Sequence, residues 1–225
     1  MKNPISTLLN VCALATLAFC GSALAQKAGS FSASIGATHI APSVDSGNLS
    51  APSLPNSKID VNSNSQVTGA VNYMVTDNVA VHVPIGFGYK FDVSGAGAIS
   101  GVGKLVETRV LPITAMAQYR FLDANATFRP YLGAGLSYVR FYKEKGTGTL
   151  SALTNPGGTA TGAKFDSKLA PTVQIGGVYN INEKWYLDAS YLKTFLKTRA
   201  TLTTGQTIDV TLNPNSYSFQ VGYKF

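Results

Sequence analysis

Cysteine is absent beyond residue 20, because the chain's two cysteines are Cys12 and Cys20. The rest of the chain therefore has no disulfide scaffold, no thiolate metal site and no cysteine nucleophile. Long apolar runs are also missing after residue 25, where no stretch approaches the ~20 residues of a transmembrane helix. If this part of the chain crosses a membrane, it must therefore do so as a β-barrel.

Acidic residues are scarce: 11 Asp and Glu stand against 18 Lys and Arg, which gives a net charge of +7. The basic residues are scattered, with one loose group formed by Lys143, Lys145, Lys164 and Lys168. No nucleic-acid-binding motif accompanies them, so we expect no nucleic-acid partner. Solvated loops, or contact with anionic lipid headgroups, account better for the basic balance.

Residues 1–25 have the pattern of a cleaved signal peptide. Lys2 precedes an apolar run from Leu8 to Phe19, and Ala23-Leu24-Ala25 forms an A-x-A cleavage site. Lipid attachment at Cys20 is the alternative, but Phe19 stands before it where a small residue is needed. We therefore expect an exported chain whose residues 26–225 form a single domain.

The segment from Tyr217 to Phe225 alternates strictly, with aromatic or apolar residues at odd positions and Ser, Gln, Gly and Lys at even positions. This period of two predicts a strand with one apolar and one polar face. The apolar face could pack on a soluble core or, in a transmembrane barrel, face lipid. Seven earlier segments alternate similarly, so eight strands are predicted at about 29–40, 65–75, 79–90, 107–121, 128–142, 168–179, 185–201 and 217–225.

The links between these strands alternate between long and short. Residues 41–64, 92–106, 143–167 and 203–213 form the long links, and the short turns fall at 76–78, 122–127 and 180–184. Bacterial outer-membrane barrels have this arrangement, with short periplasmic turns and long extracellular loops, and aromatic girdles at the strand ends. A soluble sandwich would not sort its loops in this way. The predicted fold is therefore an all-β, eight-stranded antiparallel up-and-down transmembrane β-barrel in a Gram-negative outer membrane, with both termini periplasmic.

A barrel of eight strands is narrow, and side chains largely fill its interior. We therefore do not expect a water-filled pore. The polar faces of the strands supply the candidate lumen residues, among which Arg120 and Asp188 are expected to pair: His82, Thr114, Met116, Gln118, Arg120, Gln174 and Asp188.

Motifs for catalysis or cofactor binding are weak. The glycines from Gly95 to Gly101 lack the dinucleotide-binding spacing, and Gly103-Lys104 lacks a P-loop context, so this stretch reads as a flexible extracellular loop. His39 and His82 show no metal-ligand spacing. His82 could act as a general base in a lipid hydrolase, but no serine stands out as a nucleophile. We expect no metal, no cofactor and no enzymatic activity.

Two prolines lie within predicted strands, Pro84 in the third and Pro112 in the fourth. Neither can donate a backbone hydrogen bond, so each weakens the strand ladder where it lies. One interpretation is a bulge near the extracellular end. The other is a local gap in the wall, through which an apolar solute could leave sideways into the membrane.

The chain resembles the OmpW family of small outer-membrane proteins from about residue 29 to residue 225. The motifs that carry the resemblance are Tyr73–Asn78, Leu111–Tyr119, Phe128–Tyr138 and the terminal Val221–Phe225. The terminal motif, with Tyr223 and Phe225, is similar to the C-terminal signal that the barrel assembly machinery recognises. Pro112 falls within the family's Leu-Pro motif, whereas Pro84 is added on physical grounds alone.

The resemblance implies a narrow, partly hydrophobic lumen that acts as a passive conduit for small apolar molecules, with lateral release into the outer membrane. The expected partners are therefore outer-membrane lipid and small apolar solutes, with the assembly machinery during biogenesis. The alternative is a structural or receptor-like surface barrel that acts through its long extracellular loops, since one fold hosts many functions.

Overall fold

The structure, a computed structural model, describes residues 26–225, so the predicted signal peptide lies outside the described residues. Within residues 26–225, no helix is both long and apolar enough to cross a membrane.

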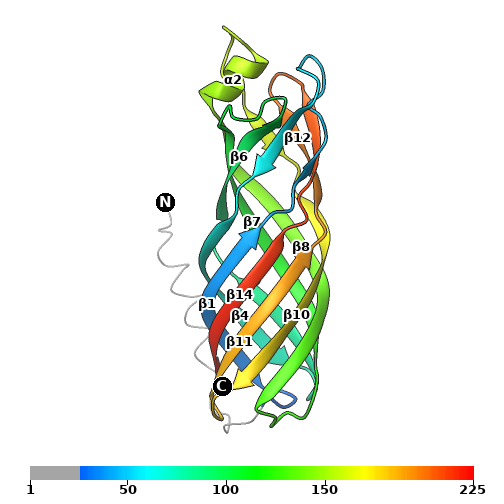
Figure 1. The fold of residues 1–225 in the computed structure, drawn as a ribbon. Helices are drawn as coiled ribbons and strands as arrows, with labels where there is room; N and C mark the ends of the chain where they lie inside the picture. The colour runs from blue at the N-terminus through cyan, green and yellow to red at the C-terminus, as the bar shows by residue number, and fades with distance from the viewer. Residues whose placement is uncertain (1–25) are drawn as a thin grey trace, which may run out of the picture.

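Eight antiparallel strands close into a tall barrel in which neighbours in sequence are also neighbours in space, as predicted (Figure 1). The last strand closes the wall against the first, with Ala33 opposite Tyr223 and the Phe225 amide donating to the Phe31 carbonyl at 2.9 Å. The barrel strands are β1 (Phe31–Ala41), β4 (Asn64–Met74), β5 (Val79–Ile85), β7 (Lys104–Arg120), β8 (Phe128–Gly146), β10 (Lys168–Asn180), β11 (Trp185–Thr194) and β14 (Asn215–Lys224).

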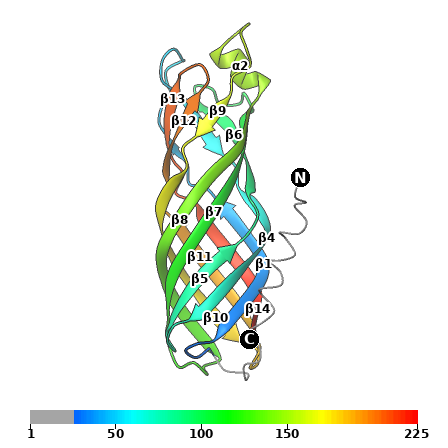
Figure 2. The same ribbon diagram turned by 180° about the vertical axis from the view of Figure 1, so that it is seen from behind.

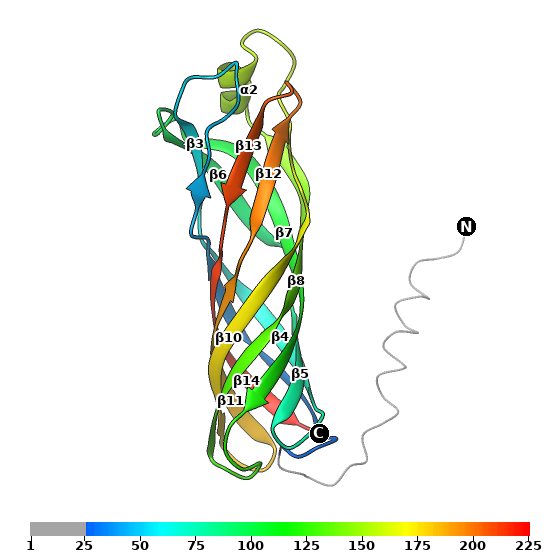
Figure 3. The same cartoon turned by 90° about the vertical axis from the view of Figure 1, so that its right-hand side faces the viewer.

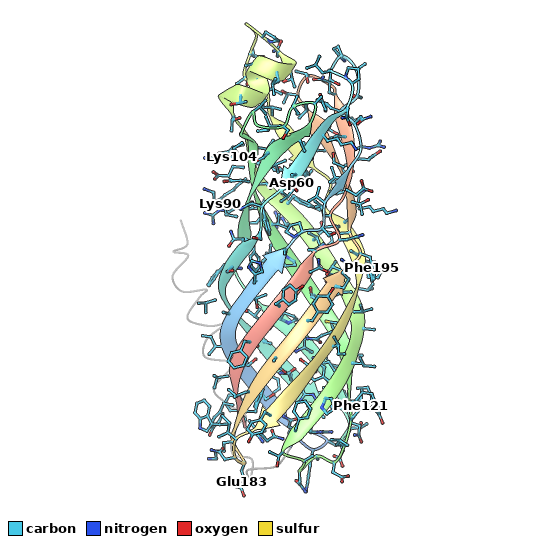
Figure 4. The ribbon with its side chains drawn as sticks, viewed as in Figure 1. Asp60, Lys90, Lys104, Phe121, Glu183 and Phe195 are labelled. Carbon is cyan, nitrogen blue, oxygen red and sulfur yellow. The ribbon has the colours of Figure 1, made fainter. Side chains whose placement is uncertain are left out.

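The alternation of the sequence becomes an apolar outer surface and a polar interior. On β14, Phe219 is exposed, whereas its neighbour Gln220 is buried inside the barrel. Aromatic rings gather at the end where Phe225 lies, and the rings of Trp185 and Tyr223 meet edge to face at 5.1 Å between centroids. Figure 4 places Phe121 near this end and Phe195 higher on the wall, both on the outside. This outer surface is the lipid-facing belt expected of a membrane barrel.

At the opposite end, the wall continues upward as two separate sheets (Figure 3). One sheet adds β6 (Tyr89–Gly97) and β3 (Ser57–Val61) to the upper part of β7. The other has the order β2 (Asp45–Ser46), β13 (Thr207–Thr211), β12 (Lys197–Leu202) and β9 (Ala163–Phe165). An apolar core that includes Val93, Leu105, Phe165, Leu202 and Ile208 fills the space between them.

These upper sheets correct several expectations about the long links. Residues 92–106 are mostly a hairpin of β6 and β7, so Gly95 and Gly97 belong to a strand and not to a flexible loop. The link 143–167 contains the helix α2 (Gly148–Thr154). The Thr147 hydroxyl caps the first turn of this helix by accepting a hydrogen bond from the Leu150 amide. The predicted strand 185–201 is divided into β11 and β12 at residues 195–196.

The predicted strand 79–90 is also interrupted, because β5 ends at Ile85 and β6 begins at Tyr89. The interruption exchanges the two faces of the strand. Tyr89 was expected on the outer face and Lys90 on the inner face, but Tyr89 is buried inside and Lys90 is exposed outside. A one-residue change of register reverses every side chain beyond it, which is why the alternation predicted the wrong faces here.

Candidate functional site

The barrel wall is interrupted between β5 and β7. The ladder between these strands ends at the pair of His82 and Met116, and β7 next pairs with β6 at Tyr89 and Val110. In the described structure, residues 83–88 and residues 111–115 therefore face each other with no ladder pairs between the two segments. Seen from behind, β5 lies beside the lower part of β7 and β6 beside its upper part (Figure 2).

The local sequence explains why the ladder fails here. Pro84 and Pro112 lie on the two sides of the interruption, and neither has a backbone N–H to donate. Beyond Pro84, the short connection to β6 contains Gly86 and Gly88, which favour an irregular backbone over a strand. The Gln66 side chain steadies this connection by donating to the Phe87 carbonyl at 2.6 Å. The Phe87 ring is 85% exposed on the outer surface, at the level of the interruption.

A cavity of about 130 Å³ lies inside the barrel against the interruption. Residues 84–87 line it on one side, and Leu111 with Pro112 line it on the other. Apolar cavities of roughly 150 Å³ bind a molecule as large as benzene. Most of its upper wall is aromatic or aliphatic: Tyr89, Phe91, Val93, Val139, Phe141 and Phe165.

A ring of hydroxyl and amide side chains forms the floor of this cavity. Thr114, Ser137 and Thr172 form a chain of hydrogen bonds with two steps of 2.7 Å, and Thr172 continues it to Thr194 at 3.0 Å. On the facing wall, Thr38 bonds to Thr68 and Ser218, and Gln220 bonds to Ser34 and Thr68. Because these polar groups bond to one another, they need no water from the cavity.

Below this ring, a polar cluster fills the half of the barrel near the termini. Arg120 is its centre, and its guanidinium donates to Gln26 Oε1 at 2.8 Å, Gln118 Oε1 at 3.1 Å and Asn72 Oδ1 at 3.3 Å. Gln118 donates in turn to Gln174 at 2.8 Å, and His82 Nδ1 lies 2.7 Å from Asn72 Oδ1. We call these residues, together with Arg129, Tyr131 and Asp188, the polar plug.

The expected pair of Arg120 and Asp188 does not form among the described residues. Asp188 instead accepts a bifurcated hydrogen bond from the single proton of the Tyr131 hydroxyl, whose oxygen lies 3.0 Å from each carboxylate oxygen. The Arg120 guanidinium lies over the Tyr131 ring, 5.9 Å from its centroid. Tyr131 thus lies between the two charged groups and contacts both of them.

The structure brings most of the candidate lumen residues together, at two levels. Thr114 belongs to the hydroxyl ring, whereas His82, Gln118, Arg120, Gln174 and Asp188 belong to the polar plug. Met116 is buried inside between the two levels. The described residues contain no group of three or more His, Cys, Asp or Glu side chains that could hold a metal ion.

The sequence reasoning missed Gln26, Arg129 and Tyr186. Arg129 is fully buried and donates to the carbonyls of Gln26, Asp77, Phe121 and Leu122, so it ties the short turns to the plug. The glycines at inward-facing strand positions could have indicated where large side chains lie inside the barrel. A Cβ on Gly176 would meet the Tyr131 ring and one on Gly222 would meet the Tyr186 ring, so each glycine makes room for an inward tyrosine.

A second apolar cavity of about 60 Å³ lies above the first, within the core between the two upper sheets. Val93 and Phe165 line both cavities, so their side chains separate the two spaces. Leu54 and Leu153 also line the upper cavity and are exposed at the surface. An apolar lining thus extends from the outer surface to the interrupted wall.

Comparison with known proteins agrees with this architecture. The sequence matches the OmpW family over residues 27–225. Outer membrane protein W of Vibrio cholerae serotype O1 is 36% identical over 224 residues, which cover 96% of this chain and 98% of that protein. The dibenzothiophene metabolism operon protein PahQ of Pseudomonas aeruginosa is 26% identical over 182 residues, covering 79% of each chain. The crystal structure of OprG from P. aeruginosa shares the fold, with a TM-score of 0.79 at 24% identity, covering 88% of this chain and 97% of OprG.

Proposed function

Because the chain belongs to the OmpW family of outer-membrane proteins, we propose that it carries small apolar molecules passively from the cell exterior into the outer membrane. The solute enters the upper cavity, passes Val93 and Phe165, and reaches the lower cavity. It then leaves sideways between β5 and β7, past Pro84 and Pro112. The observation that carries this proposal is the apolar cavity that lies against the stretch of wall where β5 and β7 do not pair with each other.

The polar plug supports a sideways exit over an exit into the periplasm. A solute that continued downward would have to separate Arg120 from its three acceptors. Breaking hydrogen bonds to a buried charge costs about 1.5–3 kcal/mol each, and an apolar molecule cannot replace them. In contrast, moving from the apolar cavity into lipid exposes no apolar surface to water.

The relative PahQ indicates which probe to use first. Its name refers to dibenzothiophene metabolism, and dibenzothiophene is a flat aromatic molecule. The aromatic upper wall of the lower cavity, with Tyr89, Phe91 and Phe141, is suited to stacking on such a ring system. We therefore propose aromatic compounds as a solute class; a three-ring solute is larger than either cavity, so its passage requires the side chains of Val93 and Phe165 to move aside.

The test measures uptake of dibenzothiophene by cells that lack the protein or carry one of its variants. The variant P84V/P112V restores a backbone N–H on each side of the interruption, so that the ladder can extend from His82 and close the wall. We expect its uptake to fall to the level of cells without the protein. The matched control is P171V, because Pro171 lies within the paired ladder of β10 and β8 and its replacement closes nothing.

Unchanged uptake by P84V/P112V, at equal amounts of folded barrel in the outer membrane, would refute lateral exit. Equal loss in P171V would mean that strand prolines affect uptake through stability and not through a gap. Equal uptake with and without the protein would refute the transport proposal as a whole.

The second candidate function is surface recognition, and the ordered upper sheets favour it. The sheet of β2, β13, β12 and β9 lies at the end of the barrel opposite to the termini (Figure 3). A polar surface on this sheet is lined by Asp45, Asp166, Lys197 and Arg199. Shortening the β12–β13 hairpin should abolish attachment or receptor activity while leaving solute uptake unchanged. Loss of uptake alone would count against this function.

A further inference from the structure

We propose that the outer face of β6, β7 and β8 binds the phosphorylated headgroup of a lipid A molecule from the outer leaflet, through Arg109 and Arg140 with help from Lys90. Lys90 lies directly opposite Arg109 in the β6–β7 ladder. Arg140 on β8 lies opposite Leu111, which is the next outward-facing position on β7 below Arg109. All three basic side chains are exposed on the outside of the wall. Figure 4 shows Lys90 there, on the same side as Lys104.

Carboxylates of the protein balance the lysines at this surface but not its two arginines. Lys90 contacts Glu107 at 2.9 Å, and Lys104 contacts Asp92 and Glu107 at 3.4 Å each. Within residues 26–225, Arg109 and Arg140 have no carboxylate within 4.0 Å and no side-chain hydrogen bond.

Lys90 lies opposite Arg109 but is already paired with Glu107, so Arg109 and Arg140 are the groups of the patch whose charge is left for an anion. Arginine is well suited to the task, because its planar guanidinium donates two parallel hydrogen bonds to a phosphate group.

The surface below the patch indicates a lipid and not a soluble phosphate. On the same outer faces, Ile113 follows Arg109 by four residues and Tyr138 precedes Arg140 by two, and both side chains are exposed. A ligand with a phosphate at the level of the arginines and acyl chains along Ile113 and Tyr138 would satisfy both parts of the surface. In the outer leaflet of a Gram-negative outer membrane, that ligand is lipid A. This proposal does not depend on solute transport.

The experiment uses the folded barrel in detergent and titrates it with bisphosphorylated lipid A, with binding followed by native mass spectrometry. R109Q/R140Q should bind lipid A at least about tenfold more weakly, because two charge-assisted interactions are lost. The lipid A affinity of R109K/R140K should lie between those of the unmodified protein and R109Q/R140Q, since lysine keeps the charge and loses the paired donors. Heat-modified gel mobility confirms that each variant is folded.

The matched control is K164Q/K197Q, which removes two exposed positive charges from the other upper sheet. We expect its affinity to stay within about twofold of the unmodified protein, because scattered surface charges contribute little. Equal binding by R109Q/R140Q would overturn the proposal, and so would an equal loss in K164Q/K197Q. Undiminished binding of dephosphorylated lipid A, or full competition by inorganic phosphate, would also overturn it.

Discussion

Replacing Arg120 by alanine tests whether the polar plug stabilises the barrel. The side chain is 1% exposed and donates to Gln26, Asn72 and Gln118. Two acceptors keep another partner after the change, because Arg129 also reaches Gln26 Oε1 and His82 also bonds to Asn72 Oδ1. The Gln118 acceptor keeps none among the described residues. The substitution thus removes a buried charge together with its hydrogen bonds, and it leaves the Gln118 acceptor without a donor.

The magnitude follows from these contacts. The two shorter bonds, at 2.8 and 3.1 Å, contribute about 1.5–3 kcal/mol each as charge-assisted hydrogen bonds. Against this stands the burial of a guanidinium whose Nε has no acceptor within residues 26–225, which costs about 1–3 kcal/mol. We expect R120A to lower the free energy of unfolding by about 2–3 kcal/mol.

The assay is equilibrium unfolding in urea, with the barrel in phosphatidylcholine vesicles and tyrosine and tryptophan fluorescence as the signal. The matched control is R140A, since Arg140 is exposed and makes no side-chain hydrogen bond in the described structure; its effect should stay within about 0.5 kcal/mol. R120K should recover part of the loss by keeping the charge. A loss in R120A no larger than that in R140A would refute a stabilising plug.

Three further predictions concern packing, assembly and pH. G222V should reduce folding because its side chain meets the Tyr186 ring, and Y186A should partly rescue it; failure of rescue in a heat-modifiability assay would contradict the packing argument. F225S should lower the amount of barrel in the outer membrane if Phe225 belongs to the assembly signal, and normal amounts would count against that role. A hydrogen bond from Arg199 lowers the pKa of Asp209, so this pair should steady the β12–β13 hairpin above the ordinary aspartate range and lose that effect as the pH falls through the lowered pKa. Amide hydrogen exchange should show the change, and D209N should remove its pH dependence.

The sequence predicted the barrel because the side-chain period of a strand is two. A slip of one residue would move every apolar side chain of a strand to the polar interior, so the alternation determines which residues face inward. For this reason Gln118 and Gln174, which were expected to face the lumen, are buried inside the barrel. The number of alternating segments gave the strand count, and the sorted lengths of the links then favoured an up-and-down barrel over a soluble sandwich.

Other features depended on distances that alternation does not encode. The alternation places both Arg120 and Asp188 on the inner face of the wall. The tilt of the strands sets their positions along the barrel axis, however, and Tyr131 lies between them. The faces of Tyr89 and Lys90 were assigned wrongly because glycines 86 and 88 continued the alternation through an interrupted backbone. The upper sheets join segments far apart in the chain, such as β2 with β13 and β9 with β12, and no local pattern specifies those pairings.

The polar plug also has a consequence for the permeability of the cell envelope. Ions and water-soluble toxins cross an outer membrane only where they find a continuous hydrated path. The plug and the hydroxyl ring above it bond mainly to themselves and fill the barrel on the side of the termini. We therefore expect that a cell can hold many copies of this barrel without becoming leaky to salts or charged antibiotics. The number of copies would then be limited by membrane area and not by leakage of ions across the outer membrane.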